Sequence, residues 1–149
     1  MNGKSVAAGL WAGFLSGCVL GFFLLSVQLV TGVRVYTLLI NIDFMPFLLP
    51  LFSSEWSQFL LHLLVSCIIG MTAVYLSFRL SWNYWRISFS LSLFAALLYF
   101  PLTKLSVTPA PAWNDWVAIL FWFSGHMLYA VVLAGLIQNK KRPDMDCSP

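Results

Sequence analysis

Residues 5–33 read SVAAGLWAGFLSGCVLGFFLLSVQLVTGV, a stretch that contains no charged side chain. A helix that crosses the hydrocarbon core of a bilayer needs about 20 apolar residues, with a usual range of roughly 17–25. The stretch is therefore long enough for one crossing. It is longer than the apolar core of a secretory signal peptide, about 7–15 residues, and no small-residue cleavage site interrupts it. We expect it to be retained as a first membrane span.

The rest of the chain repeats this pattern. Charges are also missing from residues 56–78, 87–103 and 116–139, and each stretch is long enough for one membrane helix. Of the 149 residues, 9% are charged and 60% are hydrophobic, and the mean hydropathy is +0.87. About a quarter of the residues in a soluble domain are charged. The composition therefore excludes a soluble enzyme, a nucleic-acid-binding protein and a disordered regulator.

The predicted fold class is all-α, a single integral membrane domain at residues 1–149 built as a bundle of four transmembrane helices. A β-barrel is excluded because its strands alternate apolar and polar residues, whereas these runs are continuously apolar. We expect spans at about residues 6–31, 57–78, 86–103 and 115–138, followed by a cytoplasmic tail at 139–149. Asn114 is the expected N-cap of the fourth span. Pro101 lies near the end of the third span, where a lost backbone hydrogen bond costs least.

The positions of lysine and arginine predict the orientation, because these residues are more frequent on the cytoplasmic side. With both termini inside, the inner side carries six of them: Lys4, Arg79, Arg86, Lys140, Lys141 and Arg142. The outer side then carries only Arg34 and Lys104. Tryptophans near the ends of the predicted spans fit the aromatic belts of a membrane protein. We predict that both termini are cytoplasmic.

The external segment between the first two spans, residues 34–55, is long and unusually apolar. Pro46 and Pro50 prevent a regular helix through its second half. An apolar segment that cannot cross the membrane either lies in the interface or dips in and returns. Residues 34–55 are thus either an interfacial flap over the outer ends of the bundle or a re-entrant lid, in which Asp43 is the charge to test.

Glycine recurs at every fourth position of the first span, at Gly9, Gly13, Gly17 and Gly21. Residues four apart share one face of a helix, and glycines there allow a second backbone to approach closely. The pattern predicts tight helix packing through this glycine face. The partner helix can belong to the same chain or to a second copy of it.

The two histidines of the chain are the polar residues of most interest within the spans. His62 and His126 each lie among small residues spaced by four, so both are predicted to face the bundle interior. Gln28 and Lys104 lie near the same depth, which gives a candidate outward-facing pocket of Gln28, His62, Lys104 and His126. Simpler roles exist for each: the histidines as hydrogen-bond donors to a neighbouring helix, Gln28 in contact with water, and Lys104 extended to the headgroups.

Two histidines within a helix bundle also raise the possibility of haem ligation by His62 and His126. Counting along the helices separates the two rings by about five residues, roughly 7 Å, whereas haem needs them at nearly one depth. No third ligand at this level completes a zinc or copper site. We therefore predict no metal and no cofactor, with haem kept as an alternative. We also predict no catalytic residues, because the chain lacks nucleophile and phosphate-binding motifs.

Several short motifs of this chain are similar to those of one group of small membrane proteins. They are Ala8-Gly9, Ala12-Gly13, Ser16-Gly17, Leu61-His62, Phe100-Pro101-Leu102, Thr108-Pro109 and Gly125-His126. In these motifs, spread over most of the chain, the sequence resembles the YagU-type family of small bacterial inner-membrane proteins. The resemblance implies four spans in the bacterial cytoplasmic membrane and no settled biochemical activity.

These observations lead to three functional hypotheses. The first is a non-enzymatic accessory or self-associating subunit that packs through the glycine face against another membrane protein or a second copy of itself. The second is a small transporter, channel or proton-responsive sensor that uses the outward-facing pocket. The third is a haem-binding subunit. All three hypotheses place the protein in the lipid bilayer and expect no nucleic-acid partner.

Overall fold

The computed structural model describes residues 3–45, 47 and 50–141, and it is helical, with no strand in that part of the chain. The elements are α1 (Gly3–Thr31), α2 (Val35–Ile40), α3 (Glu55–Leu80), α4 (Tyr84–Leu97), α5 (Tyr99–Leu105) and α6 (Trp116–Lys141). Four stretches are long and apolar enough to cross a membrane: Ser5–Thr31, Glu55–Leu80, Tyr84–Leu105 and Trp116–Gln138. The prediction of an all-helical chain with four apolar helices of membrane-spanning length is confirmed for the described residues.

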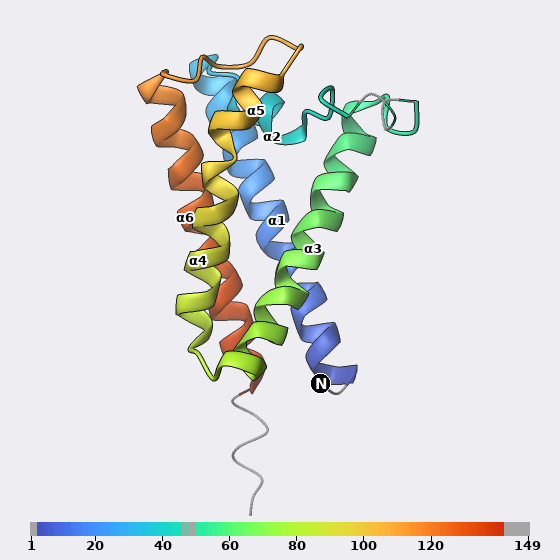
Figure 1. The fold of residues 1–149 in the computed structure, drawn as a ribbon, viewed down its shortest axis with the longest axis vertical. Helices are drawn as coiled ribbons and strands as arrows, with labels where there is room; N and C mark the ends of the chain where they lie inside the picture. Colours follow the sequence, from blue (N-terminus) through green and yellow to red (C-terminus); the bar gives the residue numbers. More distant parts are fainter. Residues whose placement is uncertain (1–2, 46, 48–49, 142–149) are drawn as a thin grey trace, which may run out of the picture.

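The four long segments run alternately up and down (Figure 1). The short helices α2 and α5 lie at one end of the bundle, which we call the loop end. The beginning of α1, the α3–α4 connection and the end of α6 lie at the other, which we call the terminal end. Helix α1 packs on α3 and α6, and α4 packs on α6, whereas α3 and α4 make few contacts with each other. The expected tail at 139–149 extends outside the described residues from 142 onwards.

The helix boundaries have local causes. Helix α3 begins at a capping box, in which the Ser54 side chain accepts a hydrogen bond from the Ser57 backbone at 3.2 Å. Helix α1 ends at Gly32, whose positive φ of 75° suits glycine. Asp115, and not the expected Asn114, precedes α6, and its carboxylate accepts from two first-turn backbone N–H groups at 3.1 Å. An aspartate also suits the positive end of the helix dipole better than a neutral amide does.

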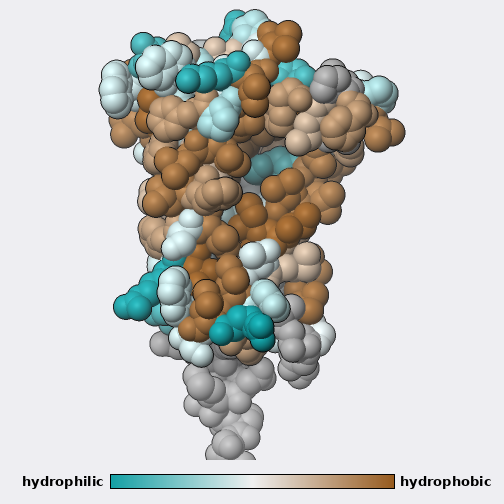
Figure 2. All heavy atoms as spheres, viewed as in Figure 1, coloured by the Kyte–Doolittle hydropathy of each residue, from teal (hydrophilic) through white to brown (hydrophobic). Residues whose placement is uncertain are grey.

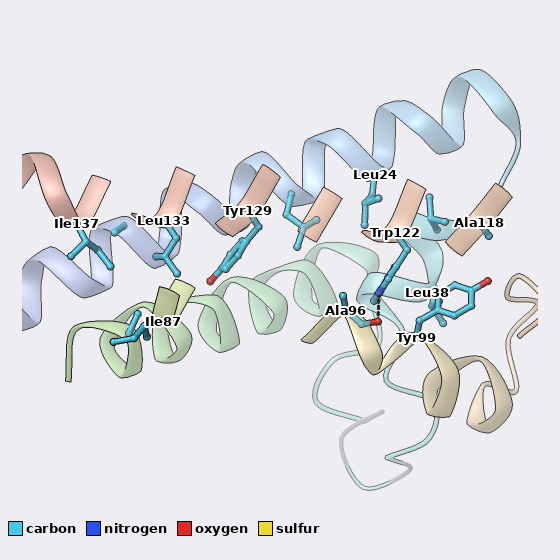
Figure 3. Close-up of a cluster of buried hydrophobic side chains, with 14 of the residues drawn as sticks. Leu24, Leu38, Ile87, Ala96, Tyr99, Ala118, Trp122, Tyr129, Leu133 and Ile137 are labelled. Carbon is cyan, nitrogen blue, oxygen red and sulfur yellow. Dashed lines mark hydrogen bonds between the residues drawn. The ribbon is translucent and has the colours of Figure 1, made fainter. Parts of the chain in front are cut away.

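The third span is interrupted, which the position of Pro101 near its end did not predict. The helix breaks at Leu98, between α4 and α5. Pro101 has no N–H to donate to the carbonyl of Leu97, four residues earlier, and its ring crowds that carbonyl. Two residues before the break, the Ala96 carbonyl accepts a 2.9 Å hydrogen bond from Trp122 Nε1 of α6, shown as a dashed line in Figure 3.

The core follows the inner face of α6 along the whole bundle. The side chains labelled in Figure 3 come from α1, α2, α4, α5 and α6: Leu24, Leu38, Ile87, Ala96, Tyr99, Ala118, Trp122, Tyr129, Leu133 and Ile137. Helix α3 adds Ala73 and Val74 to the same core. Leu38 belongs to residues 34–55, and so do the buried Val35, Ile40 and Ile42. The first part of that segment is therefore packed onto the bundle, whereas Pro46, Leu48 and Leu49 lie outside the described residues.

The outer surface of the bundle is apolar, as Figure 2 shows for one face. Large side chains such as Trp11, Phe22 and Phe94 are exposed along the helices. In water such a surface would drive aggregation, whereas in a bilayer it contacts lipid tails. Exposed tryptophans lie at both ends: Trp56, Trp113 and Trp116 at the loop end, and Trp82 and Trp85 at the terminal end. This surface is compatible with a multi-pass membrane protein.

Candidate functional site

The glycine face of α1 contacts α3 of the same chain. A Cβ atom added at Gly9 would lie 3.0 Å from the backbone oxygen of Gly70, and one at Gly17 would lie 2.6 Å from Ser66 Oγ. Added Cβ atoms at Gly13 and Gly21 would collide with Ser66 and Phe59 respectively. The two helices therefore approach closely because these positions lack side chains. The face is covered within the chain, and self-association through it would require α3 to move away.

His126 is held in place on α6 by its neighbours. Its Nδ1 lies 2.8 Å from the carbonyl oxygen of Trp122, one turn earlier. Its ring centroid lies 4.7 Å from that of Trp122. The Ser92 hydroxyl of α4 donates to its backbone carbonyl. His126 is only 4% exposed, so its ring is enclosed by the bundle.

His62 is held in a similar way on α3. Its Nε2 lies 3.3 Å from the carbonyl oxygen of Gly17 on α1. Its ring stacks on that of Phe59, with the two centroids 5.9 Å apart. Gly17 brings this carbonyl within reach because the glycine face lets α3 pack closely on α1. The tight helix pair thus orients the histidine ring.

Two hydroxyl groups lie beside the histidines. Ser66 is one turn after His62, and its hydroxyl donates to the Gly13 carbonyl at 2.6 Å. The hydroxyl of Tyr129, three residues after His126, lies 3.1 Å from Ser66 Oγ. Both hydroxyl groups are therefore engaged with α1 or with each other. This pair links α1, α3 and α6 at the level of the histidines.

His62, Ser66, His126 and Tyr129 line one cavity of about 130 Å³. The remaining lining residues are apolar or aromatic: Leu20, Leu39, Val65, Ile69, Ala95, Leu98, Leu102 and Trp122. No Asp, Glu, Lys or Arg is among the residues that line it. Figure 2 shows a hydrophilic surface at the bottom of a hollow between α3 and α4, surrounded by hydrophobic side chains. The cavity exists where α3 and α4 diverge.

Each histidine has one ring nitrogen that bonds to no other described residue. A carbonyl oxygen only accepts hydrogen bonds, so Nδ1 of His126 and Nε2 of His62 must carry hydrogens. The other nitrogen of a neutral imidazole is an acceptor. Neither Nε2 of His126 nor Nδ1 of His62 has a hydrogen-bond partner among the described residues. The lining of the cavity therefore includes two histidines that each keep one acceptor nitrogen, and hydroxyl groups that are already engaged.

The structure brings His62 and His126 together, but it places Gln28 and Lys104 elsewhere. The Gln28 amide bonds to Thr37 of α2, accepting from its backbone N–H at 2.9 Å, and thus fixes the α1–α2 turn. Lys104 Nζ lies 5.5 Å from the ring centroid of Trp113, a cation–π contact at the loop end. Similar depth along the helices grouped all four residues in the sequence, whereas Gln28 and Lys104 contact residues of the loop end, Thr37 and Trp113.

Sequence reasoning did not assign Ser66 and Tyr129 to the pocket. A signal for both was present, because residues three or four apart share a helix face. Ser66 is four residues after His62, and Tyr129 is three after His126. Trp122 lies four residues before His126 and forms another part of the cavity wall.

Haem does not fit this cavity. An engineered cavity of about 150 Å³ holds a single benzene ring, and a porphyrin is several times larger. The cavity between α3 and α4 is about 130 Å³. The described residues also contain no group of three His, Cys, Asp or Glu side chains able to hold a metal ion.

The loop end of the bundle is closed by a contact between two connections. Asp43 Oδ2 accepts hydrogen bonds from the backbone N–H groups of Val107 at 2.8 Å and Thr108 at 2.5 Å. Burial raises the pKa of Asp43, but hydrogen bonds from Thr108, Asn41 and Val107 outweigh it and hold the pKa below its ordinary value. This carboxylate latch joins the segment after α2 to the segment after α5. Leu39 and Leu102, which line the cavity, belong to these two helices.

Comparison of the chain with protein-family models, curated proteins and solved structures found no match. The resemblance to the YagU-type family therefore stays a prediction, and the site must be interpreted from its own geometry.

Proposed function

We propose that the protein is a non-enzymatic multi-pass membrane protein that binds a small molecule in the cavity between α3 and α4. The observation that carries the proposal is the cavity itself: about 130 Å³, apolar walls and two free acceptor nitrogens on buried or half-buried histidines. Apolar pockets with a few placed polar groups are the usual form of small-molecule sites. Binding is the step that a transporter and a sensor share, so the proposal belongs to that class of function.

The proposed orientation in the membrane follows from the distribution of the basic residues. The terminal end carries Arg79 and Arg86, and the loop end carries Arg34 and Lys104. The further basic residues Lys140 and Lys141 come at the end of α6, and Arg142 lies outside the described residues. We propose that the terminal end faces the cytoplasm of a bacterial cell and that the cavity lies in the outer half of its cytoplasmic membrane.

The proposal is tested by filling the cavity. Ala95 lines the cavity from α4, so Ala95→Phe places a ring into it. The protein is embedded in lipid nanodiscs, and binding of radiolabelled phenol and toluene is measured by equilibrium dialysis against empty nanodiscs. We expect saturable binding of at least one probe to the natural protein and at least a tenfold loss in Ala95→Phe.

The matched control is Leu97→Phe, which adds an aromatic ring on the same helix. Leu97 is 48% exposed on the outer surface and does not line the cavity. This variant should bind like the natural protein. If both phenylalanine variants bind equally, the probes occupy another place. If the natural protein binds neither probe saturably, the proposed function is wrong.

A further inference from the structure

The cavity opens sideways. Its rim includes Val65 of α3 and Leu98 at the break between α4 and α5, which are 49% and 42% exposed. His62 lies seven residues into α3, about 10 Å below the end of that helix. The opening is therefore flanked by two membrane-length segments, Glu55–Leu80 and Tyr84–Leu105, rather than located at the loop end. At the loop end, the Asp43 latch and the helices α2 and α5 cover the bundle. A molecule dissolved in the bilayer can thus reach the cavity between α3 and α4 without passing through water.

The volume limits the part of a ligand that can enter. A dry cavity of about 150 Å³ accommodates one benzene ring. At about 130 Å³, this cavity suits one six-membered ring, and any longer tail would extend through the opening into lipid. The indole of Trp122, which stands against His126, provides an aromatic wall. Aromatic walls favour flat rings through stacked or edge-to-face contacts.

The polar atoms determine the kind of head group. The free groups are acceptors, Nε2 of His126 and Nδ1 of His62, so a fitting ligand supplies an O–H or N–H donor. No ionised side chain lines the cavity to balance a charge on the ligand. Burial of an unpaired charge is very costly, which favours a neutral ligand. It is also unfavourable to leave the two acceptor nitrogens unpaired. A ligand with a hydrogen-bond donor therefore binds more tightly than a hydrocarbon of equal size.

From these three features we infer that the ligand is a neutral, lipid-soluble molecule with a hydroxylated six-membered ring, the phenol class. The ring enters from the bilayer between α3 and α4, and its hydroxyl donates to Nε2 of His126 or to Nδ1 of His62. This inference rests on the proposed function, which requires only that the cavity binds a small molecule. It adds the chemical class and the route.

The test compares three probes of one ring each in nanodiscs: phenol, toluene and benzoate. They share the ring and differ in the group that meets the histidines: a neutral donor, a methyl group and an anion. We expect phenol to bind about tenfold more tightly than toluene, with benzoate weakest. His126→Leu and His62→Leu each remove one acceptor, and at least one of these variants should reduce phenol binding towards the toluene level. Unchanged phenol binding in both variants would overturn the inference.

The control variant is Ser88→Ala. Ser88 is also a buried polar residue, its hydroxyl has no hydrogen-bond partner among the described residues, and it does not line the cavity. It should leave the preference for phenol unchanged. Equal binding of phenol and toluene that Ala95→Phe abolishes would overturn the inference and leave the proposed function standing. Tighter binding of benzoate than of phenol would also overturn the inference and leave the proposed function standing, because an anion would require positively charged imidazole rings. No saturable binding of any probe would overturn both.

Discussion

At the scale of single residues, backbone carbonyls determine what the two histidines can do. The carbonyls of Gly17 and Trp122 each occupy one nitrogen of a ring, and the other nitrogen is left for the cavity. Each histidine therefore does two things: one nitrogen binds its ring to the bundle and the second is available to a ligand. Asp43 also bonds to backbone groups, and its carboxylate thereby joins two connections.

Asp43 makes the stability of the loop end dependent on pH. Its pKa is lowered in the folded protein, so the carboxylate stabilises the fold above the unfolded-state pKa of about 4. This stabilisation is lost as the pH falls through the lower, folded-state pKa. We expect Asp43→Ala to lower the free energy of unfolding by about 2 kcal/mol at pH 7 and to lose less stability on acidification. Thermal unfolding followed by circular dichroism in detergent, at pH 7 and near pH 3, measures both effects.

The control is Asp115→Ala, which removes a carboxylate that caps α6 but does not join two connections. It should lower stability by about 1 kcal/mol, as loss of an N-cap does. An Asp43→Ala protein as stable as the natural one at pH 7 would show that the latch does not hold the loop end.

At the scale of helices, the close contact between α1 and α3 places His62 and Ser66 against the carbonyls of α1. The contact depends on missing side chains, and a Cβ atom added at Gly13 would collide with the backbone of Ser66. The sequence pattern predicted a packing face, but not whether the partner was in the chain, because small residues allow close approach by any helix. It also did not predict α2 or the break at Leu98, since local propensity is weak where packing decides.

Gly13→Ala should separate α1 from α3. The added methyl group meets backbone atoms of Ser66 and Cys67, which cannot rotate away, so we expect a loss of about 1–3 kcal/mol in stability. Gly135→Ala is the matched control, because nothing lies within 4 Å of a Cβ at that position of α6. It should be neutral or gain up to about 1 kcal/mol from helix propensity. The measurement is the thermal unfolding midpoint of each variant in the same detergent. Equal midpoints would contradict the claim that the missing side chain at Gly13 allows α1 and α3 to pack closely.

At the scale of the whole molecule, missing charges were sufficient to predict four membrane-length helices. The candidate site was harder to predict. Spacing along each helix indicated that His62 and His126 face inwards, but it grouped Gln28 and Lys104 with them. Depth along a helix says nothing about the tertiary partners, Thr37 and Trp113, that hold those two side chains elsewhere. The lateral opening between α3 and α4 is a property of the assembled bundle and has no sequence signal.

The orientation of the whole molecule is also testable. We expect the loop end to face outward, so Thr108→Cys should react with a membrane-impermeant maleimide added to intact cells. Asn83→Cys, in the connection between α3 and α4, should react only after the cells are opened. Both reactions are measured in a protein whose natural cysteines are replaced by serine or alanine. The reverse labelling pattern would place the cavity in the inner half of the membrane.

The most direct test of the central claim uses the fact that the chain contains only two histidines. Protein labelled with ¹⁵N at histidine, in nanodiscs, gives separate signals for the four ring nitrogens, and their shifts report which nitrogens carry hydrogens. We expect hydrogens on Nδ1 of His126 and Nε2 of His62. Titration with phenol should shift at least one of the two bare nitrogens, in a saturable manner that Ala95→Phe abolishes. Four ring signals that do not respond to phenol would contradict a ligand site at these histidines.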